Sequence, residues 1–450
     1  MMQGRLLSLA LAVALLAIAA TTTTALPVAV VVDPLRPHVH LHTPGDASNA
    51  APEQLHIALT ENSGEMRFIW VVQVPFNTTG ALLQGQCRVG LAAGQYVASF
   101  NATSDSYFVQ GFNGTIFDAV ASGLQPDTRY HYQCGDASSG FTADTAFLNA
   151  PVPGTSRTVN IINWGDMGVK DSAHSVAAIT EDVNTGLYEL IINAGDSSYQ
   201  DDFPTPNAYI CDNFYNQIQP FASKMPMMLV DGNHDTAQDY VQWLHRVRMP
   251  KPWTGDGPLS RFYWSFDYGP IHFLVFSTES GHDTAPGSEQ HNFMVADLQR
   301  VNTRRNITPW VVVLTHHPAY CSDLLHYERC HPEAQQFREN YEELLFQNKV
   351  DLYVTGHNHD YERSYPVHNG TVVSKSYHNS GAPVYIVNGA AGNVEGSESF
   401  FEPGIEFRAA HGITTNKGYA RWHVNMTHFD WEYFDASHKV VLDRVTLSKY

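Results

Sequence analysis

Residues 351–359 read Asp-Leu-Tyr-Val-Thr-Gly-His-Asn-His, a short apolar run that leads into a glycine and two histidines. Such a run is typical of a buried strand, and ligand sites of α/β proteins form where the strands of a sheet end. Glycine allows the chain to turn sharply at that point and to bring the next side chain inward. The stretch therefore predicts a buried strand that presents His357 and His359 at the edge of a sheet.

Four other apolar runs end in the same way. They lead into Gly165-Asp166, Gly195-Asp196-Ser197-Ser198-Tyr199, Gly232-Asn233-His234-Asp235 and Thr315-His316-His317. Each motif alone is weak evidence, because Gly-Asp pairs often form turns and neighbouring histidines often lie on the surface. Together they indicate one site, whose carboxylate, phenol, amide and imidazole groups suit Fe, Zn or Mn better than Ca²⁺ or a thiolate-bound zinc. Two such ions about 3.5–4 Å apart can activate water and hold a transferring phosphoryl group.

Two regions of the chain differ in the spacing of their apolar residues and turns. From 52 to 150 the sequence shows short strands between turns and no helical period, which favours a small β-sandwich; the expected strands are 55–59, 66–72, 86–90, 115–120 and 129–134. From about 156 buried strands alternate with helical patterns, which predicts an α/β domain with helices covering its sheets. The expected strands there are 159–164, 190–192, 227–230, 310–314 and 351–354, and the expected helices are 172–183 and 332–346.

The five motifs occur together with Tyr361-Glu362-Arg363 and Gly392-Asn393-Val394-Glu395-Gly396, and with the segments 262–269, 277–279, 418–421 and 425–428. In this combination the sequence resembles the purple acid phosphatases of the large form, within the metallophosphoesterases, from about residue 52 to the end. The resemblance implies a fibronectin type III-like N-terminal domain over 52–150. It implies a catalytic metallophosphoesterase domain over 156–450, built of two packed mixed β-sheets flanked by helices and including a family-matching segment from about 380.

The resemblance also implies an acid phosphatase that hydrolyses phosphate monoesters, of small molecules or proteins, with a metal-bound hydroxide. Fe(III) is expected in one site and a divalent Zn, Fe or Mn ion in the other, and a homodimer is a further expectation. The expected ligands of the ferric ion are Asp166, Tyr199 and His359. The expected ligands of the divalent ion are Asn233, His316 and His357. Asp196 is expected to bridge the two ions. His234 and His326 match histidines that bind phosphate or protonate the leaving group.

Four positions depart from the family pattern while all seven ligand positions are intact. Asp235 stands where plant members commonly have Glu, and His317 where many large forms have Arg. Leu325 precedes His326 where plant forms have a second histidine, and Asp360 stands where Ala is frequent. These changes bear on substrate preference and pH optimum. Asp360 is interpreted as a harmless surface charge.

The first residues have the features of a secretory signal. Arg5 precedes the apolar run 6–20, and Ala17-Ile18-Ala19 fits a cleavage site, which predicts a signal peptide over 1–19 and a lead-in over 20–51. Six Asn-x-Ser/Thr sites agree with secretion, at Asn77, Asn101, Asn113, Asn306, Asn369 and Asn425. No membrane anchor is expected. The predicted location is extracellular, with an acidic vacuolar or lysosomal compartment as the alternative.

The five cysteines are compatible with an oxidising compartment. Cys87 and Cys134 are a candidate pair within the N-terminal region, and Cys321 and Cys330 are a candidate pair within one loop. That pairing would leave Cys211 free. The sequence leaves the connectivity open.

The net charge of the chain excludes some functions, and two competing functions are considered beside the phosphatase. A formal net charge of −19 argues against non-specific binding to nucleic acids or anionic membranes. One competing hypothesis is a phosphodiesterase or nucleotide pyrophosphatase on the same scaffold. Another is a secreted binding protein whose second domain is only a scaffold, although the complete ligand set argues against it.

Overall fold

The structure is a computed structural model that describes residues 51–450 except 75–83, 110–111, 206, 253–260, 280, 324–333, 398–399 and 413–416. The predicted signal peptide, the lead-in up to residue 50, His326, Leu325 and Cys330 lie outside the described residues. No described helix has the length and apolar character that crossing a membrane requires.

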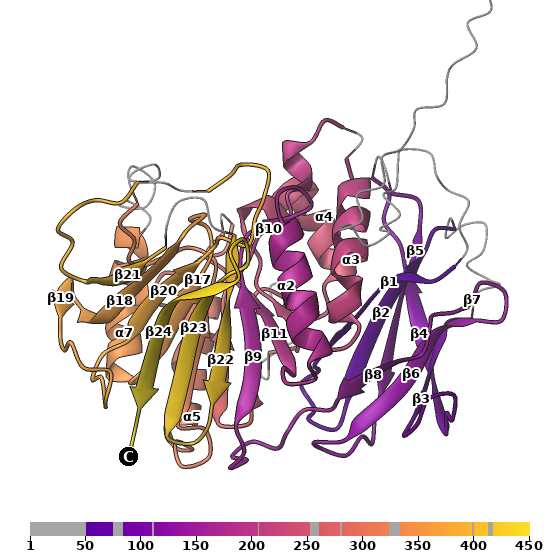
Figure 1. Cartoon of the computed structure of the whole chain (residues 1–450), viewed down its shortest axis with the longest axis horizontal. Helices are drawn as coiled ribbons and strands as arrows, with labels where there is room; N and C mark the ends of the chain where they lie inside the picture. The colour runs from indigo at the N-terminus through magenta and orange to yellow at the C-terminus, as the bar shows by residue number, and fades with distance from the viewer. Residues whose placement is uncertain are drawn as a thin grey trace, which may run out of the picture. The chain divides into compact units, whose positions relative to one another are not determined.

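The N-terminal region is built of antiparallel strands (Figure 1). Their order is β1-β2-β5-β4-β3-β6-β7, with β8 also paired to β6. The bounds are Glu53–Ala58 (β1), Met66–Val72 (β2), Gln86–Gly90 (β3), Ala98–Asp105 (β4), Thr115–Ala121 (β5), Arg129–Asp136 (β6), Gly140–Phe141 (β7) and Thr145–Leu148 (β8). The first half of β4 pairs with β3 and its second half pairs with β5, so β4 passes between the two halves of the sandwich.

The second region contains two mixed sheets. One has the order β13-β11-β9-β22-β23-β24, and the other has the order β14-β15-β16-β17-β20-β18-β19 with β21 paired to β18. The first sheet consists of Val159–Trp164 (β9), Leu190–Asn193 (β11), Met227–Leu229 (β13), Gly418–Val424 (β22), His428–Asp435 (β23) and Val440–Ser448 (β24). The second consists of Trp264–Tyr268 (β14), Ile271–Val275 (β15), Trp310–Leu314 (β16), Leu352–Thr355 (β17), Tyr361–His368 (β18), Thr371–Val372 (β19), Val384–Asn388 (β20) and Arg408–His411 (β21).

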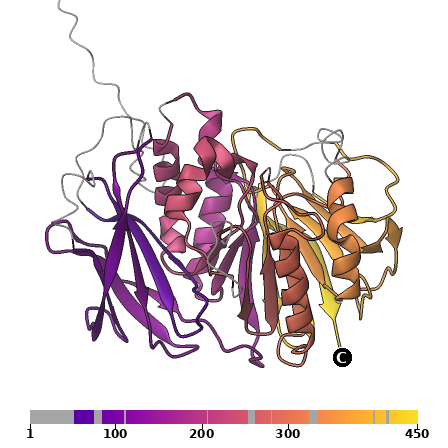
Figure 2. The same ribbon diagram turned by 180° about the vertical axis from the view of Figure 1, so that it is seen from behind.

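Helices cover the outer faces of these sheets (Figures 1 and 2). They are Ala173–Asn184 (α2), Tyr209–Ala222 (α3), Ala237–Arg246 (α4), Glu289–Asn302 (α5) and Glu343–Gln347 (α7). The predicted helix 332–346 is confirmed from residue 334 onward: residues 334–337 are helical, a π-helical turn follows over Arg338–Glu342, and α7 continues it.

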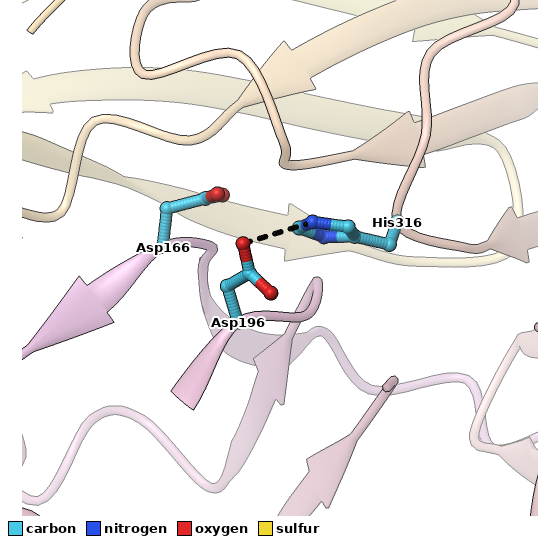
Figure 3. Close-up of side chains that lie close together, drawn as sticks. All are labelled: Asp166, Asp196 and His316. Atoms are coloured by element: carbon cyan, nitrogen blue, oxygen red, sulfur yellow. Dashed lines mark ion pairs between the residues drawn. The ribbon is translucent and has the colours of Figure 1, made fainter. Parts of the chain in front are cut away.

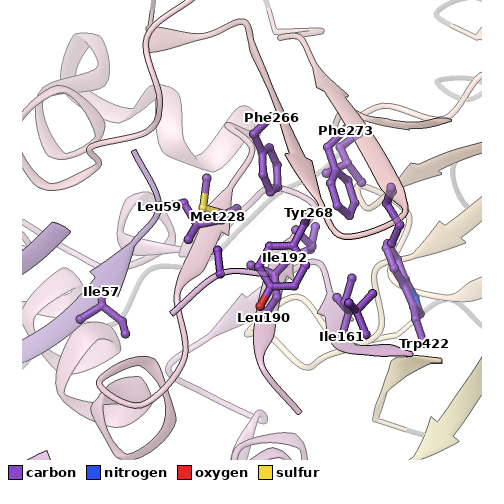
Figure 4. Packing of buried hydrophobic residues seen from close by; sticks show 14 of the residues in the cluster. Ile57, Leu59, Ile161, Leu190, Ile192, Met228, Phe266, Tyr268, Phe273 and Trp422 are labelled. Carbon is purple, nitrogen blue, oxygen red and sulfur yellow. The ribbon is translucent and has the colours of Figure 1, made fainter. Parts of the chain in front are cut away.

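Alternation along the strands divides the core into layers. Ile161 on β9 packs in the layer between the sheets, whereas its neighbour Ile162 packs under α2 and α3. Likewise Phe273 on β15 faces the inner layer and Leu274 faces α5. Figure 4 shows the inner layer, where residues of both sheets meet. This period of two explains why the strands are nearly continuous apolar runs: both of their faces are buried.

The fold also contains two short paired strands and a disulfide. Met167–Gly168 (β10) pairs in parallel with Ser197–Ser198 (β12) beside the strand ends. The predicted disulfide Cys87–Cys134 is confirmed and joins facing residues of β3 and β6. Cys211 is free and buried on α3. Cys321 is disulfide-bonded, while its predicted partner lies outside the described residues.

Candidate metal centre

Six of the seven predicted ligands follow strands whose carboxyl ends lie at one edge of the two sheets. Asp166, Asp196 and Asn233 follow β9, β11 and β13, which are parallel neighbours in the first sheet. His316 and the pair His357 and His359 follow β16 and β17, parallel neighbours in the second sheet. Tyr199 follows β12. Figure 3 shows Asp166, Asp196 and His316 pointing toward one another across the gap between the sheets.

Three of the ligands form one group around the phenol oxygen of Tyr199. This oxygen lies 3.2 Å from Oδ1 of Asp166 and 3.0 Å from Nε2 of His359. Nε2 of His359 in turn lies 3.5 Å from Oδ1 of Asp166. These are the three residues for which the resemblance implies a ferric ion.

The second group centres on the amide oxygen of Asn233. This oxygen lies 3.2 Å from Nε2 of His316 and 2.9 Å from Nδ1 of His357. Asp196 joins the two groups, because its Oδ2 atom lies 3.1 Å from Nε2 of His316 and 3.4 Å from the phenol oxygen of Tyr199. The structure thus brings all seven predicted ligands together.

Two glycines make this approach possible. A Cβ atom on Gly232 would lie 2.2 Å from Oδ1 of Asp196, and a Cβ atom on Gly356 would lie 2.1 Å from Oδ2 of Asp166. Neither position therefore admits a side chain. The glycines of the motifs serve the close packing of one ligand loop against another.

The chemistry of the donor set fits bound cations. Nδ1 of His316 lies 2.9 Å from the carbonyl oxygen of Ala194, which can only accept, so Nδ1 carries a proton. Nε2 of the same ring then faces the oxygens of Asp196 and Asn233, a contact that requires either a proton or a metal ion between the nitrogen and these oxygens. Asp166, Asp196, Tyr199 and His316 are all buried. Buried carboxylates and imidazoles in such contact are the ordinary setting of a metal ion.

Electrostatics among the protein groups agree with a cation site. Burial raises the pKa of Tyr199 well above its usual value, and the carboxylates of Asp166 and Asp196 raise it further. Burial acts to lower the pKa of His316, but the charge and hydrogen bond of Asp196, together with the charges of Asp166 and Glu279, raise it. The negative charge of the carboxylates thus favours positive charge at this place.

His234 lies at the rim of the site. Its backbone N–H donates to Oδ1 of Asp196 at 2.8 Å, and its ring centroid lies 4.1 Å from that of Tyr199. Nδ1 is 3.0 Å from Oδ1 of Asp201, and Nε2 is 3.7 Å from Oε2 of Glu395. Burial acts to lower the pKa of His234, but these carboxylates, with Asp196 first, raise it to about 12. The ring is thus held between carboxylates at the rim of the site.

Two residues at the site were not predicted from the sequence. Asn393 is buried, and its side-chain amide donates to the phenol oxygen of Tyr199 at 3.1 Å and to the carbonyl oxygen of Asp166 at 3.2 Å. Glu395 places Oε2 at 3.7 Å from Nε2 of both His234 and His359. Both residues follow β20, but four residues separate the strand from Asn393, so neither has the pattern of a polar group directly after an apolar run.

The interpretation of Asp360 as a surface charge is wrong. Only 5% of this residue is exposed. Its backbone N–H donates to the carbonyl oxygen of Asn358, and its carbonyl oxygen accepts from the N–H of Gly389. These bonds fix the segment between β17 and β18 against the end of β20, and they carry Asp360 inside.

Comparison with known proteins identifies the family of this chain. Three family descriptions match: "Purple acid Phosphatase, N-terminal domain" over residues 52–149, "Calcineurin-like phosphoesterase" over 159–361, and "Iron/zinc purple acid phosphatase-like protein C" over 382–444. "Probable purple acid phosphatase 20" of Arabidopsis thaliana is 30% identical over 431 residues, which span 92% of this chain and 91% of the relative. "Acid phosphatase type 7" of Homo sapiens is 29% identical, over 85% of this chain and 87% of the relative.

A solved structure shares the fold. The purple acid phosphatase PPD1 from seeds of yellow lupin (Lupinus luteus) superposes with a TM-score of 0.77 at 22% identity, over 89% of this chain and 75% of that one. The two mixed sheets with polar residues at their carboxyl edge, and the calcineurin-like phosphoesterase match over residues 159–361, define a metallophosphoesterase. More narrowly, the chain belongs to the purple acid phosphatase family and is an acid phosphatase that acts on phosphate esters.

Proposed function

We propose that this protein is a secreted acid phosphatase that hydrolyses phosphate monoesters at a dinuclear centre, with Fe(III) in one site and a divalent Zn, Fe or Mn ion in the other. Asp166, Tyr199 and His359 would hold the ferric ion. Asn233, His316 and His357 would hold the divalent ion, and Asp196 would bridge the two. Cations bound there would supply Lewis acidity that activates water and stabilises a transferring phosphoryl group.

The position of Asp196 carries the proposal. A single carboxylate oxygen of this residue contacts one member of each ligand group, His316 at 3.1 Å and Tyr199 at 3.4 Å. A carboxylate so placed can bridge two ions. The phenol group of Tyr199 favours ferric iron on its side of the bridge, because phenolate is a hard anionic ligand suited to a trivalent ion.

His234 is proposed to bind the phosphate group or to protonate the leaving oxygen, and His326 is proposed to share this role. For His234 the structure supports the role by position: its ring lies against Tyr199, and two carboxylates hold its nitrogens. Those carboxylates favour the charged form of the ring, and a charged ring would attract an anionic substrate and could donate a hydrogen bond to the departing oxygen.

The decisive test of the bridge is the variant Asp196→Asn. An amide oxygen carries no negative charge and bridges two cations poorly, so the variant should lose one of the two ions and lower kcat for a phosphomonoester by about 1000-fold, equivalent to about 4 kcal/mol. The matched control is Asp144→Asn, because Asp144 pairs with His131 in the N-terminal region, away from the site. Equal activity of the Asp196→Asn variant and the wild type would refute the proposal.

Monoester preference is tested on the wild type. A phosphomonoester and the corresponding bis-ester are compared at several pH values, and the monoester should have the higher kcat/KM, with a maximum below pH 7. A much higher kcat/KM for the bis-ester would instead establish a phosphodiesterase or nucleotide pyrophosphatase on the same scaffold.

Secretion is supported by the glycosylation motifs. Among the described sites, Asn101, Asn113, Asn306 and Asn369 are exposed, so the structure leaves them accessible. Expression of the whole chain in eukaryotic cells should yield a glycosylated protein in the medium, with residues 1–19 removed. N-terminal sequencing and a mass shift on deglycosylation provide the measurement. An intact N-terminus on intracellular, unglycosylated protein would contradict secretion.

A further inference from the structure

His317 covers one face of the proposed divalent-metal ligand His357. The two rings are stacked, with centroids 3.9 Å apart and planes inclined by 24°. The ring of Phe337 meets His317 at a steep angle, with centroids 5.6 Å apart and planes inclined by 69°. Only 8% of His317 is exposed. The imidazole of His357 is therefore backed by a second, buried imidazole.

His317 is itself held at three points. Its Nε2 atom lies 3.2 Å from Oε1 of the buried Glu279, and its backbone N–H donates to Oγ1 of Thr278 at 3.0 Å. Its carbonyl oxygen accepts from the hydroxyl of Tyr353 at 3.1 Å. Ring and backbone are thus both fixed by neighbours that lie on β17 or just after β15. The stack presents a rigid surface to His357.

His357 needs such support more than the other histidines of the site. Its backbone has φ +70°, a left-handed conformation that a residue with a side chain adopts only when its surroundings impose it. The torsion that turns an imidazole ring about its Cβ–Cγ bond has broad minima, so packing must select the ring orientation. Nδ1 of His357 faces the amide oxygen of Asn233 at 2.9 Å, and the ring of His317 covers one face of the imidazole in this orientation.

We infer that His317, tethered by Glu279, is a positioning residue that fixes the ring of His357 for the divalent ion. The inference rests on the proposed dinuclear centre. It assigns to the histidine pair His316-His317 two different tasks: the first is a ligand, and the second holds another ligand in place. Residues of this kind typically change metal affinity by about 10–100-fold when they are replaced.

The test compares His317→Leu with His317→Phe. Both variants fill the site with an apolar side chain and remove the partner of Glu279, but only phenylalanine keeps a flat ring against His357. With Zn²⁺ in the divalent site, zinc release to an excess of a fluorescent zinc chelator is followed by the emission of the zinc-bound chelator. The visible absorption of the ferric site is recorded at the same time, since it reports on Tyr199 and should stay unchanged.

The expected result is zinc release about 10–100-fold faster from the leucine variant and within about threefold of wild type from the phenylalanine variant. Should both variants fail to fold, Glu279→Gln keeps the shape and weakens the tether, and release should quicken at least about twofold. The inference is overturned if the leucine variant releases zinc as slowly as the wild type. If only Glu279→Gln folds, the inference is overturned when that variant releases zinc as slowly as the wild type.

A matched control exists elsewhere in the chain. His368 stacks on Phe346 with centroids 3.7 Å apart and an inclination of 8°, and its Nε2 atom lies 2.9 Å from Oε2 of Glu343. His368→Leu therefore removes the same pair of contacts away from the site and should leave zinc release unchanged. Faster release from this variant would show a general loosening and overturn the inference. A wild type that binds neither zinc nor iron would refute the dinuclear centre itself.

Discussion

Four of the proposed ligands have left-handed backbone conformations. The φ angles are +61° at Asp166, +52° at Asp196, +55° at Tyr199 and +70° at His357. For residues other than glycine each such conformation costs on the order of 1 kcal/mol or more, and it persists only when the surroundings impose it. The strand ends therefore aim these side chains at a fixed point. Rigid placement of this kind suits a centre whose function depends on the separation of two ions.

Part of the site was predictable at the residue scale and part was not. The sequence predicted the ligand positions because each motif places an oxygen or imidazole group directly after an apolar run and beside a glycine or another ligand. Asn393 and Glu395 lack that signal, since four residues separate β20 from Asn393. The burial of Asp360 depends on contacts of its backbone with another strand end, which no local pattern encodes.

Cys211 provides a prediction about a single residue. Burial raises the pKa of its thiol to about 12, and Sγ lies 3.1 Å from Oγ of Ser198 and 3.2 Å from Oε1 of Gln200. A buried neutral thiol is unreactive. The native protein should give no colour with a thiol reagent, and the unfolded, unreduced protein should give about one equivalent, in keeping with two disulfides. Rapid labelling of the native protein would contradict this placement.

At the scale of elements, β14, β15 and α5 are joined by a buried charge cluster. His272 is fully buried, and its two ring nitrogens lie 2.7 Å from Asp267 and 2.6 Å from Asp297. Arg304 pairs with Asp267 and Arg300 pairs with Asp297. Burial acts to lower the pKa of His272, but the two aspartates raise it, and His272 in turn helps to lower theirs.

This cluster predicts how stability depends on pH. The contribution of His272 is fully present below the unfolded-state pKa of about 6.5 and is lost as pH rises through the higher folded-state value. The contribution of Asp267 and Asp297 is lost in acid, as pH falls through their lowered values. His272→Leu should cost about 3 kcal/mol at pH 6 and less at high pH. Chemical unfolding at a series of pH values measures the difference, and a cost independent of pH would contradict the account.

Elements were predicted where burial leaves a periodic pattern. Strands such as β9 and β16 are short apolar runs, and their existence and positions are confirmed. β4 was not predicted, because its sequence Ala-Ser-Phe-Asn-Ala-Thr-Ser-Asp is largely polar and exposed. It forms because β3 and β5 offer hydrogen-bonding edges on either side. Such pairing is a tertiary effect that overrides local propensity.

At the scale of the whole molecule, one buried arginine ties the β domain to the catalytic region. Arg246 on α4 is 2% exposed, donates to Gln54 on β1, and lies 2.6 Å from Asp212 on α3. Its Nε donates to the hydroxyl of Tyr107 at 2.7 Å, and its guanidinium lies 4.6 Å from the ring centroid of Phe112. No local sequence pattern predicts this cluster, because its members are up to 192 residues apart.

Arg246→Met is the corresponding test. The change keeps the length of the side chain but leaves Asp212 buried without its cation, which should lower the free energy of unfolding by about 3–5 kcal/mol. The control is Arg444→Met, which removes an exposed pair with Glu432 and should change stability by less than about 1 kcal/mol.

Calorimetry should show one transition in the wild type, because one hydrophobic cluster continues from the β domain into the sheets. Two separate transitions would contradict a shared core.

The central claim is that Tyr199 binds ferric iron beside a second ion, and metal analysis combined with a visible spectrum tests it most directly. The purified wild type should contain about one iron and one divalent ion per chain and should absorb visible light through tyrosinate-to-iron charge transfer. Tyr199→Phe should lose that band while remaining folded, and Tyr341→Phe, a change at another buried tyrosine, should keep it. A folded, colourless wild type without bound metal, or a band that survives in Tyr199→Phe, would contradict the account.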